Sequence, residues 1–302
     1  MHQIREVIWR GPDGGTSTNV SSAATNLNAN ISLTFAEGNV EATYRSCQFC
    51  GARGKLTRED IVPIWATNRL AELGHPREVQ VFTRLAFPSS DRDFVKSWKA
   101  RSYSALVART VCENCNNGWM SNVEAGAAMS IKRMMGKGRI GLSTDDQMKI
   151  ATWLTLKLYT FDRVTLPFRN ATALVSEEEM RDFRETLTPP REFYARLGFL
   201  EEFGNHAVTF EKQPTVTDAS FPNSPPGVTP ARTEFRFSLG CVLFHCYFAN
   251  KATPERDLPL VDLEPQPHWT IIWPQLSGQN WPPPRHINFN ELPVIQSSHW
   301  WR

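Results

Sequence analysis

Apolar residues recur at helical spacing in the stretch that follows residue 119. Their intervals of three and four residues predict an amphipathic helix that continues to about residue 135. Asn117 or Ser121 is expected to cap its start, since Ser121 and Glu124 match a capping box, and Gly136 is expected to end it. The apolar positions of this helix are Met120, Val123, Ala127, Ile131 and Met134.

Three other segments carry the same period. Residues 64–73 have a helical pattern in which Trp65 faces inward. A longer helix is predicted to start at Thr144, and another at Ser176, which with Glu179 matches a capping box. The middle of the chain is therefore expected to be mainly helical.

From about residue 191 the period shortens to two. Apolar residues alternate in Phe193–Phe199 and again in Phe235–Leu239, and Trp269–Trp273 is a short β-prone run. This alternation predicts an antiparallel sheet of several strands. One earlier strand is predicted over Ala105–Val111, because it is a β-branched, mostly apolar run.

The composition narrows the class of protein. The chain has 302 residues, 41% of them hydrophobic, and a formal net charge of +2. Any contact with nucleic acid must then come from a local basic patch. No apolar run approaches the roughly 18–20 residues of a membrane span, and the N-terminal sequence lacks an apolar signal segment. We therefore expect a cytoplasmic protein that does not contact a membrane.

Two Cys-x-x-Cys pairs are the most specific chemical feature. Cys47 and Cys50 form the first pair, and Cys112 and Cys115 form the second. Four thiolates with this spacing predict one structural zinc site. Two disulfides or four free buried thiols are the alternatives, although disulfides are typical of small secreted domains.

The remaining two cysteines have a different setting. Cys241 and Cys246 lie in an apolar run, so they are expected to be buried core residues rather than metal ligands.

The sequence around the two cysteine pairs resembles the HNH endonuclease family. Leu56–Trp65 reads L-T-R-E-D-I-V-P-I-W, and Cys112–Met120 reads C-E-N-C-N-N-G-W-M. They are similar to a subset of that family in which a first cysteine pair leads into T-x-E-H-I-x-P-x-W and a second leads into N-N-x-W-M-S-x-x-E. The resemblance covers about residues 45–135.

The resemblance implies a ββα-metal nuclease with a catalytic divalent ion besides the zinc. Glu59 matches the acidic ligand of that ion, and Asn116 matches the polar ligand at the helix start, with Asn117 as its neighbour. The implied ion is Mg²⁺ or Mn²⁺, which prefer oxygen ligands. Asp60 stands where the family has its general-base histidine, and an ordinary Asp is a much weaker base than imidazole.

Three outcomes fit this departure. Asp60 acts as base or as a second metal ligand in a slower nuclease, or another histidine such as His75 takes over, or the module has lost catalysis and kept binding. The family's middle asparagine is also missing from residues 105–111.

Four basic residues are the candidate phosphate contacts. Arg58 and Arg109 lie beside the cysteine motifs, and Lys132 and Arg133 lie near the end of the predicted helix. The expected function is metal-dependent hydrolysis of DNA phosphodiester bonds, weakened by the change at Asp60, with RNA as another possible substrate. The alternative is an inactive zinc-knuckle protein that binds nucleic acid or a protein partner.

The patterns together predict an α+β fold, with a zinc-stabilised ββα-metal module followed by helices and a mainly antiparallel, β-rich C-terminal region. Four segments are expected. They are a flexible arm over 1–44, the zinc-knuckle module over 45–140, a helical segment over 141–190 and the β-rich region over 191–302.

Overall fold

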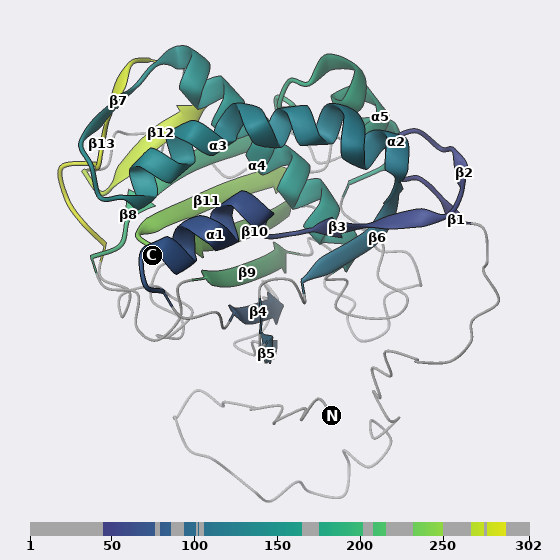
Figure 1. The fold of residues 1–302 in the computed structure, drawn as a ribbon, viewed down its shortest axis with the longest axis horizontal. Coiled ribbons are helices and arrows are strands. Elements are labelled where there is room, and N and C mark those ends of the chain that lie inside the picture. The colour runs from purple at the N-terminus through teal and green to yellow at the C-terminus, as the bar shows by residue number, and fades with distance from the viewer. Residues whose placement is uncertain are drawn as a thin grey trace, which may run out of the picture.

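The fold is α+β, as predicted, and it combines one large sheet with a layer of helices (Figure 1). The computed structural model describes residues 45–75, 79–85, 94–100, 102, 106–164, 175–201, 208–215, 232–249, 267–274 and 277–287. The arm predicted over 1–44 lies outside these residues.

The large sheet has seven strands in the order β12-β8-β11-β10-β9-β4-β5. Neighbouring strands are antiparallel except for β4 and β9, which are parallel. The mainly antiparallel C-terminal sheet is therefore confirmed. The strands of this sheet are β4 (Val79–Leu85), β5 (Phe94–Ala100), β8 (Phe193–Phe199), β9 (Val208–Thr215), β10 (Arg232–Leu239), β11 (Val242–Ala249) and β12 (Trp269–Trp273).

Strands from two predicted segments share this sheet. β4 and β5 come from the segment 45–140, whereas the other five strands come from 191–302. The parallel register Val79↔Val208 joins the two groups. The zinc-knuckle segment and the C-terminal region are thus connected through one continuous sheet.

Within the described residues, three two-stranded sheets lie outside the large one. Strand β3 pairs with β6, which lies far along the chain. The pairs are β1 (Arg45–Ser46) with β2 (Arg53–Gly54), β3 (Leu56–Asp60) with β6 (Val107–Cys112), and β7 (Ile140–Leu142) with β13 (Gln279–Trp281).

The predicted helices are present. The capping box of Ser176 and Glu179 is confirmed, because each side chain bonds the other residue's backbone N–H. The described helices are α1 (Ile64–Glu72), α2 (Glu113–Cys115), the π-helical turn η3 (Asn116–Met120), α3 (Ser121–Met135), α4 (Thr144–Val164) and α5 (Glu177–Thr186).

The start of the helix after the second cysteine pair was predicted wrongly. Neither Asn117 nor Ser121 caps it, because the chain is already helical from Glu113 and continues through a kink at Gly118. Ser121 therefore lies inside the helix, with no free N–H groups to cap. Glu124 makes a different contact, described below.

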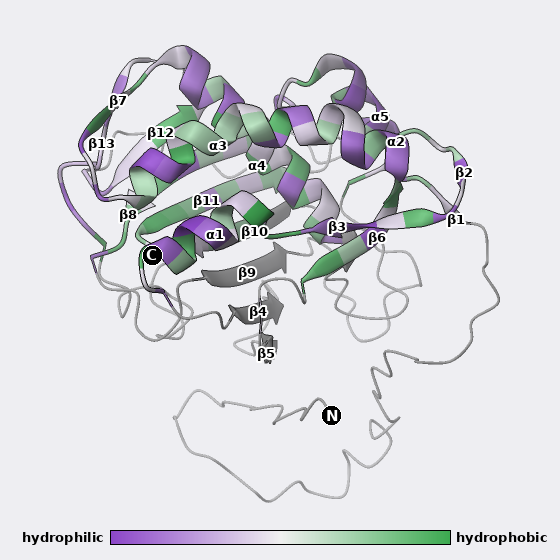
Figure 2. Cartoon of the chain, viewed as in Figure 1, coloured by the Kyte–Doolittle hydropathy of each residue, from purple (hydrophilic) through white to green (hydrophobic). Residues whose placement is uncertain are grey.

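Helix α4 lies at the centre of the core, between the sheet and α3 (Figure 1). Every residue from Ile150 to Asp162 is buried, so the helix is enclosed on all sides. Trp153 packs on Phe237 and Phe244 of the sheet, with ring centroids 5.6 Å and 5.5 Å apart. In Figure 2 the apolar colour concentrates on the strands beneath these helices. No helix in the described part of the chain is long and apolar enough to cross a membrane.

Candidate metal centre and hairpin–helix junction

The four cysteines of the two pairs form one cluster. Their sulfur atoms all lie within 4.8 Å of one another. The Sγ atoms of Cys50 and Cys112 are 3.6 Å apart. A disulfide requires about 2.0 Å, whereas sulfurs around a tetrahedral zinc, with Zn–S near 2.3 Å, lie about 3.8 Å apart. All six cysteines are free thiols. The cluster can therefore hold a metal ion, and its four sulfurs are a ligand set that zinc prefers.

Local backbone geometry brings the cysteines together. Cys47 and Cys50 lie on the turn between β1 and β2, where Gly51 adopts a left-handed conformation (φ +70°) that glycine accommodates best. The N–H of Gly51 donates to the carbonyl of Cys47 at 2.8 Å and closes this turn. The N–H of Gln48 then donates to the carbonyl of Thr110 at 2.9 Å, which ties the turn to β6 and so to the second pair.

Trp119 packs the helix against this turn. Its ring meets the fully buried ring of Phe49 edge to face, with centroids 5.1 Å apart. The Trp119 side chain is half-buried in this contact.

A strand pair and the helix after it lie beside the cluster, although α1, β4 and β5 come between the two strands in the chain. Strands β3 and β6 form the hairpin-like pair, and the helix follows β6 through Cys115. The side-chain amide of Asn116 donates to Thr57 Oγ1 and to the carbonyl of Arg58, both at 3.2 Å. Asn116 therefore fastens the start of the helix to the strand that carries Glu59. Asn117 is exposed.

Glu59 is engaged by a lysine from a distant helix. Its side chain is 7% exposed, and its Oε1 lies 2.7 Å from the Nζ of Lys157, whose side chain is 1% exposed. The same Nζ forms an ion pair with Glu124 on α3 and donates to the carbonyl of Asp60 at 2.8 Å. Burial raises the pKa of Glu59, while Lys157 opposes that rise.

Lys157 is held in its charged form. Burial alone would lower its pKa, but the carboxylates of Glu124 and Glu59 outweigh burial, so the pKa of Lys157 is raised.

Asp60 is the more accessible member of the acidic pair. It is half-buried at the end of β3, and burial raises the pKa of its carboxyl group against the opposing effects of Lys157 and Arg58. A raised pKa brings an aspartate closer to the range of a useful general base. Asp60 is thus placed at the strand end, on the same strand that Asn116 bonds.

The arrangement does not fit the predicted catalytic ion at Glu59. Within the described residues, the cysteine cluster is the one group of three or more His, Cys, Asp or Glu side chains positioned to share an ion. The ammonium of Lys157 already donates a hydrogen bond to Oε1 of Glu59. The side-chain amide of Asn116 donates to Thr57 and Arg58 on β3.

His75 does not reach the acidic pair. It follows the C-terminal end of α1, about 13 Å of helix from the end that adjoins β3. Its ring lies beside the backbone of Gly240, where an added Cβ would be 3.2 Å from its Nε2. Burial, helped by Lys137, lowers the pKa of His75.

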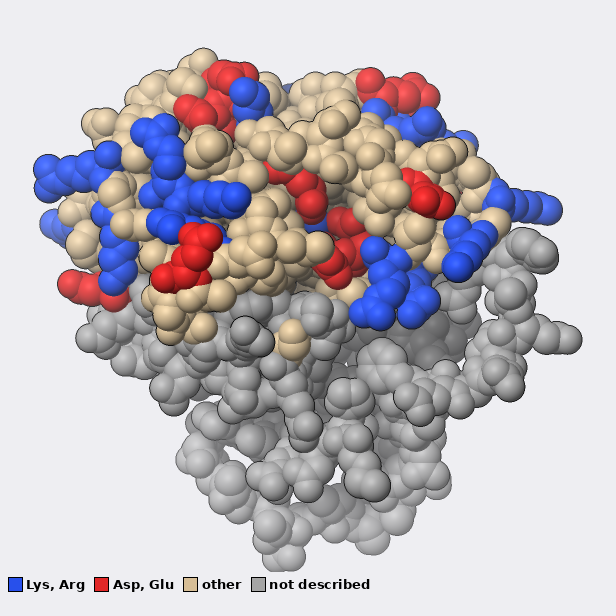
Figure 3. Space-filling view, viewed as in Figure 1, with Lys and Arg blue, Asp and Glu red and all other residues tan. Residues whose placement is uncertain are grey.

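The candidate phosphate contacts fall into two groups. Arg58 and Arg109 are exposed on β3 and β6. Lys132 and Arg133 line a groove of about 450 Å³ between α1 and the end of α3. Figure 3 shows basic side chains gathered in two such groups on one face, with acidic side chains between them.

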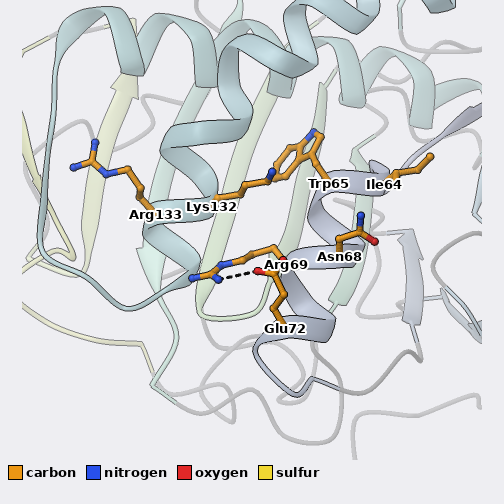
Figure 4. A pocket seen from close by; sticks show the side chains of 7 residues that line it. All are labelled: Ile64, Trp65, Asn68, Arg69, Glu72, Lys132 and Arg133. Atoms are coloured by element: carbon orange, nitrogen blue, oxygen red, sulfur yellow. Dashed lines mark hydrogen bonds and ion pairs between the residues drawn. The ribbon is translucent and has the colours of Figure 1, made fainter.

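The groove between α1 and α3 has an aromatic floor and a basic rim (Figure 4). Lys132 Nζ lies 5.9 Å from the centroid of Trp65, a cation–π contact. Arg69 pairs with Glu72 at 2.9 Å. The lining residues are Ile64, Trp65, Asn68, Arg69, Glu72, Lys132 and Arg133.

Two residues of the junction were missed by sequence reasoning. Lys157 falls on the apolar stripe of α4, three residues after Leu154 and four before Phe161, where a charge requires a buried partner. This charged residue among apolar positions was the signal in the sequence for a buried ion pair. Glu124 was interpreted as a capping residue, although it belongs to the motif shared with the HNH subset.

Comparisons with models of protein families, with curated proteins and with solved structures found no match to this chain. The likeness to HNH endonucleases therefore depends on the cysteine pairs and the motifs beside them.

Proposed function

We propose that this protein is a zinc-organised, HNH-like nucleic-acid-binding protein. The supporting observation is the ββα arrangement around four clustered cysteines, in which Asn116 bonds the strand that carries the acidic pair. Binding is favoured over cleavage because Lys157 neutralises Glu59, the acidic residue that would hold a catalytic ion.

The basic groups on either side of the junction supply the affinity. Arg58 and Arg109 are exposed on the strand pair, and Lys132 and Arg133 are available at the groove beside α1. Cationic side chains without a fixed set of base contacts bind phosphates whatever the sequence. The expected ligand is DNA or RNA, bound with little sequence preference and with a steep salt dependence.

Binding is tested by fluorescence anisotropy with labelled DNA and RNA. The double variants Arg58→Ala/Arg109→Ala and Lys132→Ala/Arg133→Ala should each weaken binding and lower the salt slope by about one for every phosphate that the variant no longer neutralises. Arg184→Ala, at an exposed site on α5, is the matched control and should change neither. Wild-type protein that binds neither DNA nor RNA at low salt contradicts the proposal.

Metal-dependent cleavage is the second candidate, and the position of Asp60 favours it. Asp60 is half-buried at the strand end where the family has its histidine, and its pKa is raised. Plasmid DNA with about 1–10 mM Mg²⁺ or Mn²⁺ tests it. If a hydrolytic site exists, Asp60→His should raise cleavage or leave it strong, and Asp60→Ala should reduce it by up to the about 10²–10⁴-fold that a general base contributes. If wild type and Asp60→His are both inert while DNA binds, the module binds without cutting.

A further inference from the structure

A lysine enclosed in the core is the least expected feature of the junction. Lys157 lies in the middle of α4, and its side chain is 1% exposed. A buried ammonium without partners is strongly unfavourable, so its surroundings must compensate the charge.

Its surroundings are a set of oxygen atoms from two separate elements. Glu59 Oε1 lies at 2.7 Å and the carbonyl of Asp60 at 2.8 Å, both on β3, and Glu124 on α3 completes the set. Two of the three donors of the ammonium make these hydrogen bonds, and Glu124 contacts it as an ion pair. Two carboxylates and a backbone carbonyl are also the oxygen ligands that hard divalent cations take.

We infer that the ammonium of Lys157 takes the place of a divalent cation at the hairpin–helix junction. It binds β3 to α3 from within, so the junction assembles without any metal ion besides the one at the cysteines. Replacing Lys157 with an uncharged residue turns the same oxygens into a binding site for Mg²⁺, Ca²⁺ or Mn²⁺. This inference does not depend on the proposed binding of nucleic acid.

Charge counting supports the substitution. One ammonium faces two carboxylates, Glu59 and Glu124, so the group keeps a net charge of −1, and nearby Asp60 adds another negative charge. Without the ammonium, the buried carboxylate of Glu59 and the partly exposed carboxylate of Glu124 would lie close together with no counter-charge. A bound divalent cation would offset the charges of Glu59 and Glu124, whereas protonation of one carboxyl group would remove only one of them.

The test is the thermal stability of Lys157→Met as a function of divalent ions. Met fills a similar volume and carries no charge, so the variant should melt well below wild type in ion-free buffer. Mg²⁺ or Ca²⁺ at about 100 times its Kd should raise its Tm by about 4–8 °C, whereas wild type should shift by less than about 1 °C. Titration with Mn²⁺, followed by electron paramagnetic resonance, should show one bound ion in the variant only. Zinc content is measured in parallel and should stay the same.

Two control variants isolate the site. Lys157→Met/Glu59→Gln removes the lysine and one of its two acidic partners, so its Tm should respond much less to divalent ions. Lys149→Met, at an exposed lysine on the same helix, should behave like wild type. If Lys157→Met does not fold even with Ca²⁺, the neutral variant Lys157→Gln must show the same ion response. No ion response in either lysine variant, an equal response in the double variant, or one tightly bound Mn²⁺ in wild type overturns the inference.

Discussion

At the hairpin–helix junction, the buried charged side chains that pair with one another come from three distant segments. In the large sheet, they come from adjacent strands. In the sheet, Arg236, His245 and Arg196 occupy one row across β10, β11 and β8. Arg196 Nε donates to His245 Nδ1 at 2.9 Å, and His245 Nε2 lies 2.5 Å from Glu234. Strand pairing alone aligns this group, while the junction forms only when β3, α3 and α4 are all in place.

The two regions also use cysteine differently. The thiols at the junction face one another and can share a metal ion, whereas Cys246 is buried in β11 and Cys241 is buried at the turn between β10 and β11, beside the end of α3. Burial raises the pKa of Cys241 to about 11, so that thiol stays protonated. The prediction that these two cysteines belong to the core is confirmed. The junction therefore combines charged groups with thiols that can hold an ion, whereas the sheet depends mainly on packing.

The largest effect is expected from removing one sulfur ligand, which should unfold the junction. Cys112→Ser should abolish tight zinc binding, and because a structural zinc is linked to folding by about 10–16 kcal/mol of apparent binding free energy, the junction should unfold. Zinc content and hydrogen exchange of β3, β6 and α3 measure this. Cys246→Ala is the matched control, since it should keep the metal and lose about 1 kcal/mol. Zinc bound equally in both variants would contradict a four-cysteine site.

A packing change in the sheet should destabilise the molecule without affecting the metal. Phe244 is fully buried and stacks on Phe237, with centroids 4.4 Å apart. Phe244→Ala should lower the free energy of unfolding by about 3–5 kcal/mol, and Phe244→Leu by much less. Denaturant unfolding gives both values. If zinc were also lost at low denaturant, metal binding at the junction would depend on the packing of the sheet.

Acid should weaken the sheet through His245. Burial, together with Arg196, lowers the pKa of His245 to about 3, and the pKa of Glu234 is lowered as well because Arg236 and His245 outweigh its burial. The unfolded chain then binds more protons, so stability present above about pH 6.5 is lost as pH falls toward 3. The Tm measured between pH 7 and pH 4 should fall less steeply in His245→Gln, which keeps a donor and an acceptor. Parallel curves for wild type and variant would contradict this source of acid sensitivity.

The smallest effect is expected at the start of the helix. Asn116→Ala removes two hydrogen bonds to β3 and should cost about 1–2 kcal/mol, with faster release of the metal to a chelator. Asn117→Ala, at the exposed neighbour, should stay within about 0.5 kcal/mol of wild type. Equal metal release from the two variants would mean that Asn116 does not fasten the helix to the strand.

Local patterns predicted the elements that depend on local forces. The capping box at Ser176 uses only the first turn of α5, and the apolar period of the segment after residue 119 reflects one helix face. The four-cysteine cluster was also predictable, because its spacing is characteristic of a chemistry rather than of a fold. The capping box, the helix face and each of the two cysteine pairs are signals contained in a few neighbouring residues.

Long-range pairings could not be predicted in the same way. Glu59 and Lys157 are 98 positions apart, and no local pattern states which acid a buried lysine will meet. The same applies to β3 and β6, which can pair only when the residues between them in the chain bring the two strands together. Ser121 was expected to cap a helix, because a capping motif alone does not reveal that the helical chain continues through the kink at Gly118.

The parallel contact between β4 and β9 has a consequence for synthesis of the chain. Residues 45–140 leave the ribosome carrying β4, yet the strand that covers its edge begins only at Val208. Until then the β4–β5 pair presents an uncovered strand edge, which is a site for pairing with other chains. A fragment that ends at residue 140 would keep this edge permanently. Isolating the cysteine-rich part for study should therefore favour aggregation, and experiments on it are best carried out on the full chain.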